Sequence, residues 1–186
     1  MKKTIKPFRP VYPTPAGLVT SVDRQGRPNI ITLGEIYNLS IREPVMVGIG
    51  IAPQRYSHQL ISETREFVVN LPTVELLEKV DRCGSVSGRD ADKFALTGLT
   101  PLPARVVRPP LIEECPVNIE CQLVEVVRTS DHDLFIGNVV AVHVDAECLD
   151  EREAVRYDKL RPLAYLTGQY WSLGSYLASH GFTRKK

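Results

Sequence analysis

The residues best suited to chemistry are Arg55, Tyr56 and Ser57, which open a helix predicted over 57–64. Ser57 has the residue type of an N-cap, and Tyr56 with Ile61 has the spacing of a hydrophobic staple. The first turn of a helix presents unpaired backbone N–H groups, and an arginine and a hydroxyl beside them favour a phosphate. The pattern therefore indicates an anion site. The alternative is a capped surface helix whose arginine lies in solvent.

A strand predicted over 45–51 leads toward this helix start. Its apolar residues alternate with Gly48 and Gly50, so one face carries branched side chains and the other is bare. A bare strand face lets a flat group approach the backbone. Pro53 then ends the strand. We therefore expect a flat surface close to the anion site.

Length and charge exclude several classes of function. The chain has 186 residues, enough for one domain with a sizeable core, and its 23 basic and 22 acidic residues give a net charge of +1. This balance does not favour nucleic acid or a membrane surface as a partner. The N-terminus lacks the apolar run of a signal peptide, and no stretch approaches the length of a membrane span. We expect a cytoplasmic protein.

The four cysteines, Cys83, Cys115, Cys121 and Cys148, follow no metal-binding or disulfide pattern. None are paired as C-x-x-C, and no histidine stands at a zinc-ligand spacing from them. We expect buried, reduced thiols and no metal site.

Short strands outnumber short helices. Strands are predicted at 17–23, 29–34, 45–51, 66–71, 118–127 and 134–145, and helices at 57–64, at 73–80 and in a short turn near Phe94. The stretches predicted to be irregular are the proline-bearing lead-in 1–16, the polar segment 35–40, the loop 81–94 and, as helix or irregular structure, 151–161. Strands and long helices do not alternate, which argues against a doubly wound sheet and favours a closed antiparallel barrel.

Four segments in order resemble one family. They are 15–23 with 26–32, then 38–49 followed by 55–57, then 80–94, and finally 130–140. They are similar to the first hairpin, the flavin-cradling strand with its phosphate loop, a glycine- and serine-rich signature, and a Gly-Asp-His strand motif. The family is the flavin reductase-like, flavoredoxin-type branch of the FMN-binding split-barrel proteins, and the resemblance covers about residues 12–174.

The resemblance implies a mainly β fold with short helices, an antiparallel Greek-key split β-barrel. It also implies a single flavin reductase-like domain over 1–186, with a core of about 12–174 and tails at 1–11 and 178–186. Family members bind FMN non-covalently in a homodimer, with residues of both subunits near the cofactor. Many reduce flavin with NADH or NADPH, and others pass electrons between proteins.

The resemblance also implies roles for individual residues. Thr32, Leu33, Gly34 and Glu35 would line the isoalloxazine ring, Asn38 and Ser40 would lie near the ring and ribityl chain, Arg55, Tyr56 and Ser57 would hold the phosphate, and Ser85, Ser87 and Lys93 would complete the polar wall. Without the resemblance, the same residues read as a strand end, a solvated loop and a surface lysine.

Two further sites keep two interpretations each. His132 is either a turn histidine or a contact to a nicotinamide or flavin edge at the rim. Tyr170 and Trp171 are interpreted first as core or dimer-interface packing, and otherwise as a partial lid over the ring.

The chain departs from the family pattern at two places. Ser130 replaces the glycine before Asp-His, and Leu33-Gly34-Glu35 replaces a run of small hydroxyl residues. An acid facing a flavin ring would disfavour the anionic reduced form, so we expect the Glu35 side chain to point away from the ring. These departures bear on nicotinamide use more than on FMN binding.

No catalytic triad, carboxylate pair or metal cluster is apparent, which suits a cofactor that carries the chemistry itself. We therefore expect an FMN-binding oxidoreductase that passes hydride or electrons from NADH or NADPH to an acceptor, either free flavin or a protein. The alternatives are an electron carrier with fixed FMN and no nicotinamide site, and a ligand-binding barrel that no longer uses FMN.

Overall fold

The computed structural model describes residues 1–9 and 11–184. Pro10, one of the lead-in prolines, and positions 185–186 of the predicted tail lie outside the described residues. The strands are β1 (Thr14–Pro15), β2 (Gly17–Val22), β3 (Pro28–Leu33), β4 (Ile36–Ser40), β5 (Met46–Ile51), β6 (Glu66–Leu71), β7 (Pro101–Leu102), β8 (Leu111–Ile112), β9 (Val117–Val127), β10 (Asp133–Val144), β11 (Leu163–Leu166) and β12 (Gln169–Ser172). The helices are α1 (Tyr56–Thr64), α2 (Leu77–Ser85), α3 (Lys93–Thr97) and α4 (Tyr157–Leu160), with 3-10 turns at Val74–Leu76 and Ala146–Cys148.

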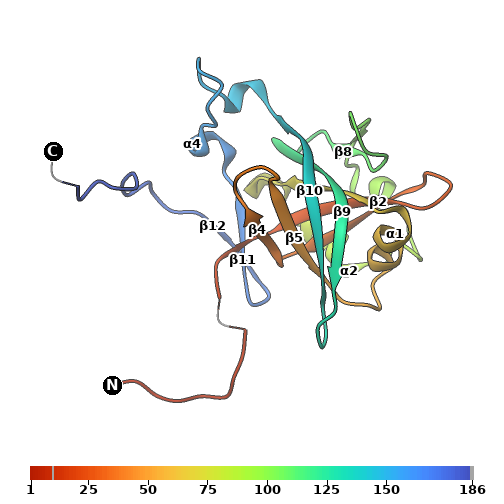
Figure 1. Cartoon of the computed structure of the whole chain (residues 1–186), viewed down its shortest axis with the longest axis horizontal. Helices are drawn as coiled ribbons and strands as arrows, with labels where there is room; N and C mark the ends of the chain where they lie inside the picture. The colour runs from red at the N-terminus through yellow and green to blue at the C-terminus, as the bar shows by residue number, and fades with distance from the viewer. Residues whose placement is uncertain (10, 185–186) are drawn as a thin grey trace.

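A seven-stranded sheet forms the body of the protein (Figure 1), in the order β3-β2-β6-β9-β10-β5-β4. Every pairing in it is antiparallel. Its two edge strands, β3 and β4, follow each other in the chain and are joined by Gly34 and Glu35 alone. A connection this short spans only about 10 Å. The sheet must therefore curl until its edges meet at that end, which confirms the predicted antiparallel barrel.

The alternation along β2 and β3 builds two cores. Val19 and Ile31 face the barrel interior, where they join Phe67 and Phe135. The neighbouring residues on the other face, Leu18 and Ile30 among them, pack with Val80, Phe94 and Ile112. Both faces of β2 are therefore buried, and α2 and α3 are held against the outside of β3. This packing places the end of α2 and the start of α3 beside β3.

Three predicted boundaries are wrong. Residues 36–40, predicted to be irregular, form the edge strand β4. The region 81–94, predicted as a loop, begins with the end of α2, which continues to Ser85 in spite of the low helix propensity of Gly84. Ser57 is not the N-cap of α1, because the helix begins at Tyr56 with Arg55 as the capping residue and no side-chain cap. The β11–β12 hairpin was not predicted.

The bare face of β5 does not receive a flat ligand. A Cβ added at Gly50 would lie 2.9 Å from the Cβ of Glu35, and one added at Gly48 would lie 2.9 Å from Leu39 and Leu134. The glycines therefore make room for side chains of the chain itself, and the expectation of a flat binding surface there is wrong.

Both ends of the chain extend away from the barrel (Figure 1). They carry exposed apolar residues, including Phe8 near the N-terminus and Tyr176, Leu177 and Phe182 near the C-terminus. No helix among the described residues is long and apolar enough to cross a membrane.

Candidate functional site, a cavity beside strand β3

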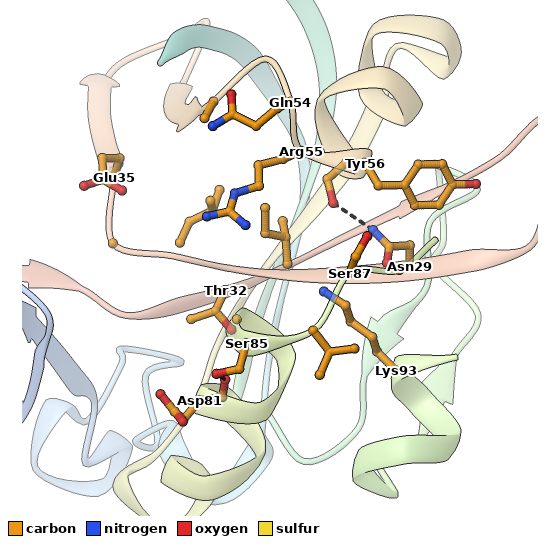
Figure 2. Close-up of a pocket in the computed structure, with 18 of the residues that line it drawn as sticks. Asn29, Thr32, Glu35, Gln54, Arg55, Tyr56, Asp81, Ser85, Ser87 and Lys93 are labelled. Carbon is orange, nitrogen blue, oxygen red and sulfur yellow. Dashed lines mark hydrogen bonds between the residues drawn. The ribbon is translucent and has the colours of Figure 1, made fainter. Parts of the chain in front are cut away.

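A cavity of about 450 Å³ opens where β3, the start of α1, the end of α2 and the loop before α3 meet (Figure 2). This volume lies in the usual range for small-molecule sites, roughly 300–1,000 Å³. The predicted site residues that line it are Thr32, Leu33, Gly34, Glu35, Arg55, Tyr56, Ser57, Ser85, Ser87 and Lys93, together with His132 and Tyr170. Asn38 and Ser40 do not line it, because they lie on the outer edge strand β4.

One side of the cavity gathers hydrogen-bond donors. Arg55, Ser87 and Lys93 lie there, next to the start of α1 (Figure 2). Arg55 is exposed, and its guanidinium makes no hydrogen bond or ion pair with any described residue. Ser57, the second residue of α1, also lines the cavity and is only 1% exposed. An unpaired arginine, a hydroxyl and a helix start are groups that can bind an anion together.

Lys93 is the unusual cation of this set, because it is buried. Its side chain is 5% exposed, and its Nζ donates to the carbonyl oxygen of Cys83 at 2.6 Å. Burial lowers the pKa of Lys93 to about 8, the Cys83 thiol opposes this shift, and the charge of Arg55 adds to it. An anion between Lys93 and Arg55 would relieve their repulsion and favour the charged amine.

The loop between α2 and α3 is fixed to α1 by Arg89. The Arg89 guanidinium donates to the carbonyl oxygen of Gln54 at 3.3 Å and to Gln59 Oε1 at 3.2 Å, and it stacks 4.8 Å from the ring of Tyr56. Ser87 Oγ accepts from the backbone N–H of Arg89 at 3.2 Å. The loop and the start of α1 therefore form a single wall.

The opposite side of the cavity is acidic and aromatic. Glu35 lines the rim there and forms an ion pair with Arg9 of the N-terminal segment. The guanidinium of Arg9 also lies 5.9 Å from the ring of Tyr165. That ring packs against bare backbone, since a Cβ on Gly34 would lie 2.3 Å from it. Figure 2 shows Glu35 and Asp81 on the side away from Lys93 and Ser87, with Arg55 extending between the two sides. The acidic side chains and the buried Lys93 therefore lie on opposite sides of the cavity.

The two aromatic residues predicted as a pair have different positions. Tyr170 lines the cavity and donates from its hydroxyl to Asp81 Oδ1 at 3.2 Å. Burial, together with the charge of Asp81, raises the pKa of Tyr170 to about 12, so it stays a neutral donor. Trp171 does not line the cavity, and it is 53% exposed. Of this pair, only Tyr170 lines the cavity, where its ring packs against that of Tyr165.

His132 reaches the cavity from the turn between β9 and β10. The turn is held by Asp133, which accepts from the N–H of Thr129 at 3.2 Å and pairs with Nε2 of His58 at 2.9 Å. The His132 side chain is 40% exposed and lies 3.4 Å from Asp131. It is therefore a rim residue whose backbone is fixed and whose ring is accessible.

Sequence reasoning missed several lining residues. They are Arg9, Asn29, Gln54, Asp81, Gly84, Gly88, Arg89 and Tyr165. One of them carried a signal in the sequence, since Asn29 lies within a strand and asparagine is depleted in strands. Gly84 carried another, because a glycine within a helix often marks close packing, here against Thr32 at 3.2 Å from an added Cβ.

An antiparallel barrel with short helices and a cavity at its rim is the architecture of the split-barrel proteins. The flavin reductase like domain model matches residues 9–174, so the chain belongs to the flavin reductase-like family. Flavoredoxin of Desulfovibrio vulgaris (Miyazaki F) is similar over 100% of both chains, with a TM-score of 0.92 and 30% identity.

Two more similar proteins carry descriptions that bear on a ligand. An FMN-binding protein of Thermus thermophilus, in a structure with bound 1-cyclohex-2-enone, has a TM-score of 0.81 and 27% identity over 96% of this chain and 97% of its own. The NADH:riboflavin 5'-phosphate oxidoreductase of Streptomyces pristinaespiralis is 29% identical over 129 residues, which is 69% of this chain and 70% of that protein.

Proposed function

We propose that the chain binds FMN non-covalently in the cavity beside β3 and passes hydride or electrons from NADH or NADPH to an acceptor, either free flavin or a protein. The observation that carries this proposal is the donor side of the cavity, where Arg55 is unpaired and Lys93 is buried without a carboxylate partner among the described residues. Membership of the flavin reductase-like family supports it, as do the names of its FMN-related neighbours.

The residues present fit FMN. A phosphate monoester carries between one and two negative charges near neutral pH, and the net charge of +1 is too small to hold it by a general field. Arg55, Lys93 and the hydroxyl of Ser57 supply a local cluster instead. The hydroxyl of Thr32 is not available to a ligand, because it donates to the carbonyl oxygen of Val80 at 2.5 Å. The segment from Thr32 to Glu35 therefore offers mainly backbone groups to a ring.

When bound, FMN supplies the redox chemistry. Arg55, Lys93 and Ser57 would hold the phosphate, the backbone at the end of β3 would face the ring, and Tyr165 and Tyr170 would limit access of water. No side chain has to act as a general base. His132, with an accessible ring at the rim, is the residue we assign to a nicotinamide contact.

The second candidate is an electron carrier with fixed FMN and no nicotinamide site. The similarity to a flavoredoxin over the full length of both chains favours it. So does the position of Arg9, which lies at the rim over Tyr165 and is paired with Glu35, a contact that would slow exchange of a bound ligand.

We propose also that the protein is a homodimer located in the cytoplasm. The dimer would bury apolar side chains that the single chain exposes, such as Trp171 and Tyr176.

Anaerobic reduction of the FMN-loaded protein separates the candidates. NADH or NADPH is added, and loss of the flavin absorbance is followed against free FMN at the same concentration. Bleaching that needs the protein supports a nicotinamide-dependent oxidoreductase. Loaded protein that dithionite bleaches and neither nicotinamide does supports the carrier. A protein that takes up no FMN overturns both and leaves a barrel that does not use this cofactor.

A further inference from the structure

Asn29 is a buried polar residue of the cavity wall to which no role has yet been given. It lies at the start of β3, it is 4% exposed, and it lines the cavity opposite the start of α1. Its Nδ2 donates to Ser57 Oγ at 2.7 Å, the contact drawn as a dashed line in Figure 2. A buried asparagine in a strand is costly unless its amide is used, so this contact needs an explanation.

The hydrogen bond decides what Ser57 offers to the cavity. A serine hydroxyl has one hydrogen to donate and two lone pairs to accept with. Asn29 occupies a lone pair of Ser57, and the Ser57 hydroxyl donates to no acceptor in the described part of the chain. Ser57 lines the cavity, so its O–H is free to point toward a ligand there. Asn29 thereby makes Ser57 a donor, which is the role that an anion requires.

The other end of the Asn29 amide meets the loop before α3. Its Oδ1 is buried and has no hydrogen-bond partner among the described residues. Gly88 lies directly against it, since a Cβ at Gly88 would be 1.9 Å from Asn29 Oδ1 and 3.2 Å from the ring of Tyr56. Only glycine fits between these side chains. Asn29 therefore contacts both walls of the donor side, α1 through Ser57 and the loop through Gly88.

We infer that Asn29 is a positioning residue that sets the preference of the cavity for a phosphorylated flavin over riboflavin. It does so by holding the Ser57 hydroxyl as a donor, and Gly88 leaves the room that the Asn29 side chain needs to make this contact. This inference rests on the proposed function, because it assigns Asn29 to the phosphate side of an FMN site. It makes no claim that Asn29 itself touches the phosphate.

The test is a double-mutant cycle that uses riboflavin as the internal reference. The wild type, Asn29→Ala, Ser57→Ala and the double variant are each titrated with FMN and with riboflavin by flavin fluorescence quenching. The selectivity ratio is the riboflavin dissociation constant divided by that for FMN. Each single variant should lower this ratio about fivefold, the size of one neutral hydrogen bond. The double variant should have the same ratio as Ser57→Ala, because Asn29 acts through Ser57.

The control is Asn118→Ala. Asn118 is a buried asparagine (7% exposed) that donates to Asn70 Oδ1 at 2.9 Å and does not line the cavity. This variant should lose stability without changing the selectivity ratio. If Asn29→Ala does not fold, Gly88→Ala replaces it, since the added Cβ would displace the Asn29 side chain without truncating it. It should lower the ratio equally, with no further loss in the Ser57→Ala background.

The outcomes separate this inference from the function on which it rests. A wild type that does not prefer FMN to riboflavin overturns both. A wild type that prefers FMN, with a ratio unchanged in Asn29→Ala, overturns only the role of Asn29. Losses that multiply in the double variant also overturn it, because Asn29 and Ser57 would then act independently.

Discussion

Arg55 is the side chain on which the donor side of the cavity most depends, because its guanidinium has no partner within the described chain. Removing a charge-assisted hydrogen bond to a partly buried anion costs on the order of 1.5–3 kcal/mol. Arg55→Ala should therefore weaken FMN binding roughly ten- to hundredfold and riboflavin binding much less. Ser57→Ala removes a neutral donor and should cost FMN less than Arg55→Ala does.

Fluorescence titration with both flavins measures this difference. Arg82→Ala is the control, since Arg82 is an exposed arginine of α2 that does not line the cavity, and this variant should change neither affinity. Equal losses for FMN and riboflavin in Arg55→Ala would mean that Arg55 acts through the fold and not through the phosphate.

Lys93 should make FMN binding depend on pH. Burial lowers its pKa to about 8, so the flavin-free protein loses this positive charge as the pH rises through about 8. A phosphate monoester is already doubly charged there, because its second pKa is about 6. The affinity for FMN should therefore fall between about pH 7 and pH 9.5, while that for riboflavin stays nearly level.

Lys93→Met keeps the length of the side chain and removes the charge. It should weaken FMN about tenfold at neutral pH and abolish the difference in pH dependence between the two flavins. The stability of the flavin-free protein should change with pH in the opposite direction to its affinity for FMN. The pKa is lower in the folded state than in the unfolded state, so the flavin-free protein should become more stable as the pH rises from about 8 toward 10. A persistent pH dependence of FMN binding in Lys93→Met would assign the titration to another group.

Single residues show what the sequence could predict about the site. Arg55 and Ser57 were identified because a cation and a hydroxyl near a helix start favour an anion, and this pattern does not require knowledge of the fold. Lys93 was identified only through the family resemblance, because its burial beside the cavity does not show in the sequence. Asn29 and Gly88 were missed because their role is a contact between segments far apart in the chain. Such a contact exists only after α2 and α3 have packed against β3.

At the scale of elements, two carboxylates hold the loop 104–108 to the sheet, and Glu66 of β6 is the first, accepting from the N–H of Arg108 at 3.2 Å. Glu120 of β9 is fully buried and accepts from the N–H groups of Arg105, Val106 and Val107 at 2.8, 2.7 and 3.0 Å. Nε2 of His143 lies 2.6 Å from its Oε1. Burial alone would raise the pKa of Glu120, but these hydrogen bonds outweigh it and the pKa is lowered.

A carboxyl group with a lowered pKa in the folded state stabilises the protein at neutral pH, and this contribution is lost as the pH falls below the ordinary glutamate value of about 4.3. Glu120→Gln removes the charge and one acceptor, and should lower the free energy of unfolding by about 2–3 kcal/mol at neutral pH. Its stability should also depend less on pH in the acid range.

Urea unfolding at several pH values measures both effects. The control is Glu125→Gln, an exposed residue of the same strand. If the free energy of unfolding of the wild type and of Glu120→Gln fell equally with pH in the acid range, the Glu120 carboxylate would not be what holds the loop.

The elements also show where sequence patterns stop being informative. The long hairpin of β9 and β10 was predicted because both strands carry extended apolar alternation. Strand β4 was missed because three of its five residues are exposed, so it shows little apolar alternation. It is a strand because it pairs with β5, and this pairing does not show in the sequence. The β11–β12 hairpin was missed for a different reason, because its strands are only four residues each and pair beside the proline-bearing β1.

At the scale of the whole molecule, one chain leaves two apolar surfaces uncovered. The first is the C-terminal segment that extends from the barrel in Figure 1, with Trp171, Leu173, Tyr176 and Leu177 exposed. The second lies along the edge strand β4 and the turn after it, with Leu39 44% and Ile41 83% exposed. Unpaired edges and contiguous apolar patches are typical of interaction surfaces.

Asn38 and Ser40 belong to the second of these surfaces. The family resemblance assigns them to the flavin, yet they lie outside the cavity of their own chain. A dimer that buries strand β4 accounts for both facts if these residues approach the cavity of the partner. Asn38→Ala should then weaken FMN binding without changing the stability of the flavin-free protein, since Asn38 is exposed in the single chain.

We therefore expect a dimer that is required for FMN binding. Tyr176→Ser and Leu177→Ser each remove a large apolar side chain whose burial is worth roughly 1.5–3 kcal/mol. Because each substitution occurs twice in a homodimer, each should raise the dimer dissociation constant about a hundred- to ten-thousandfold. Flavin content should fall together with the dimer on dilution, because the site would be complete only in the pair. Leu102→Ser, at an exposed apolar residue of the small β7–β8 sheet, is the matched control and should change neither. Mass in solution and bound flavin are measured on the same samples. A stable monomer that holds stoichiometric FMN would show that one chain contains the whole site, and the assignment of Asn38 and Ser40 to the partner would have to be given up with the dimer.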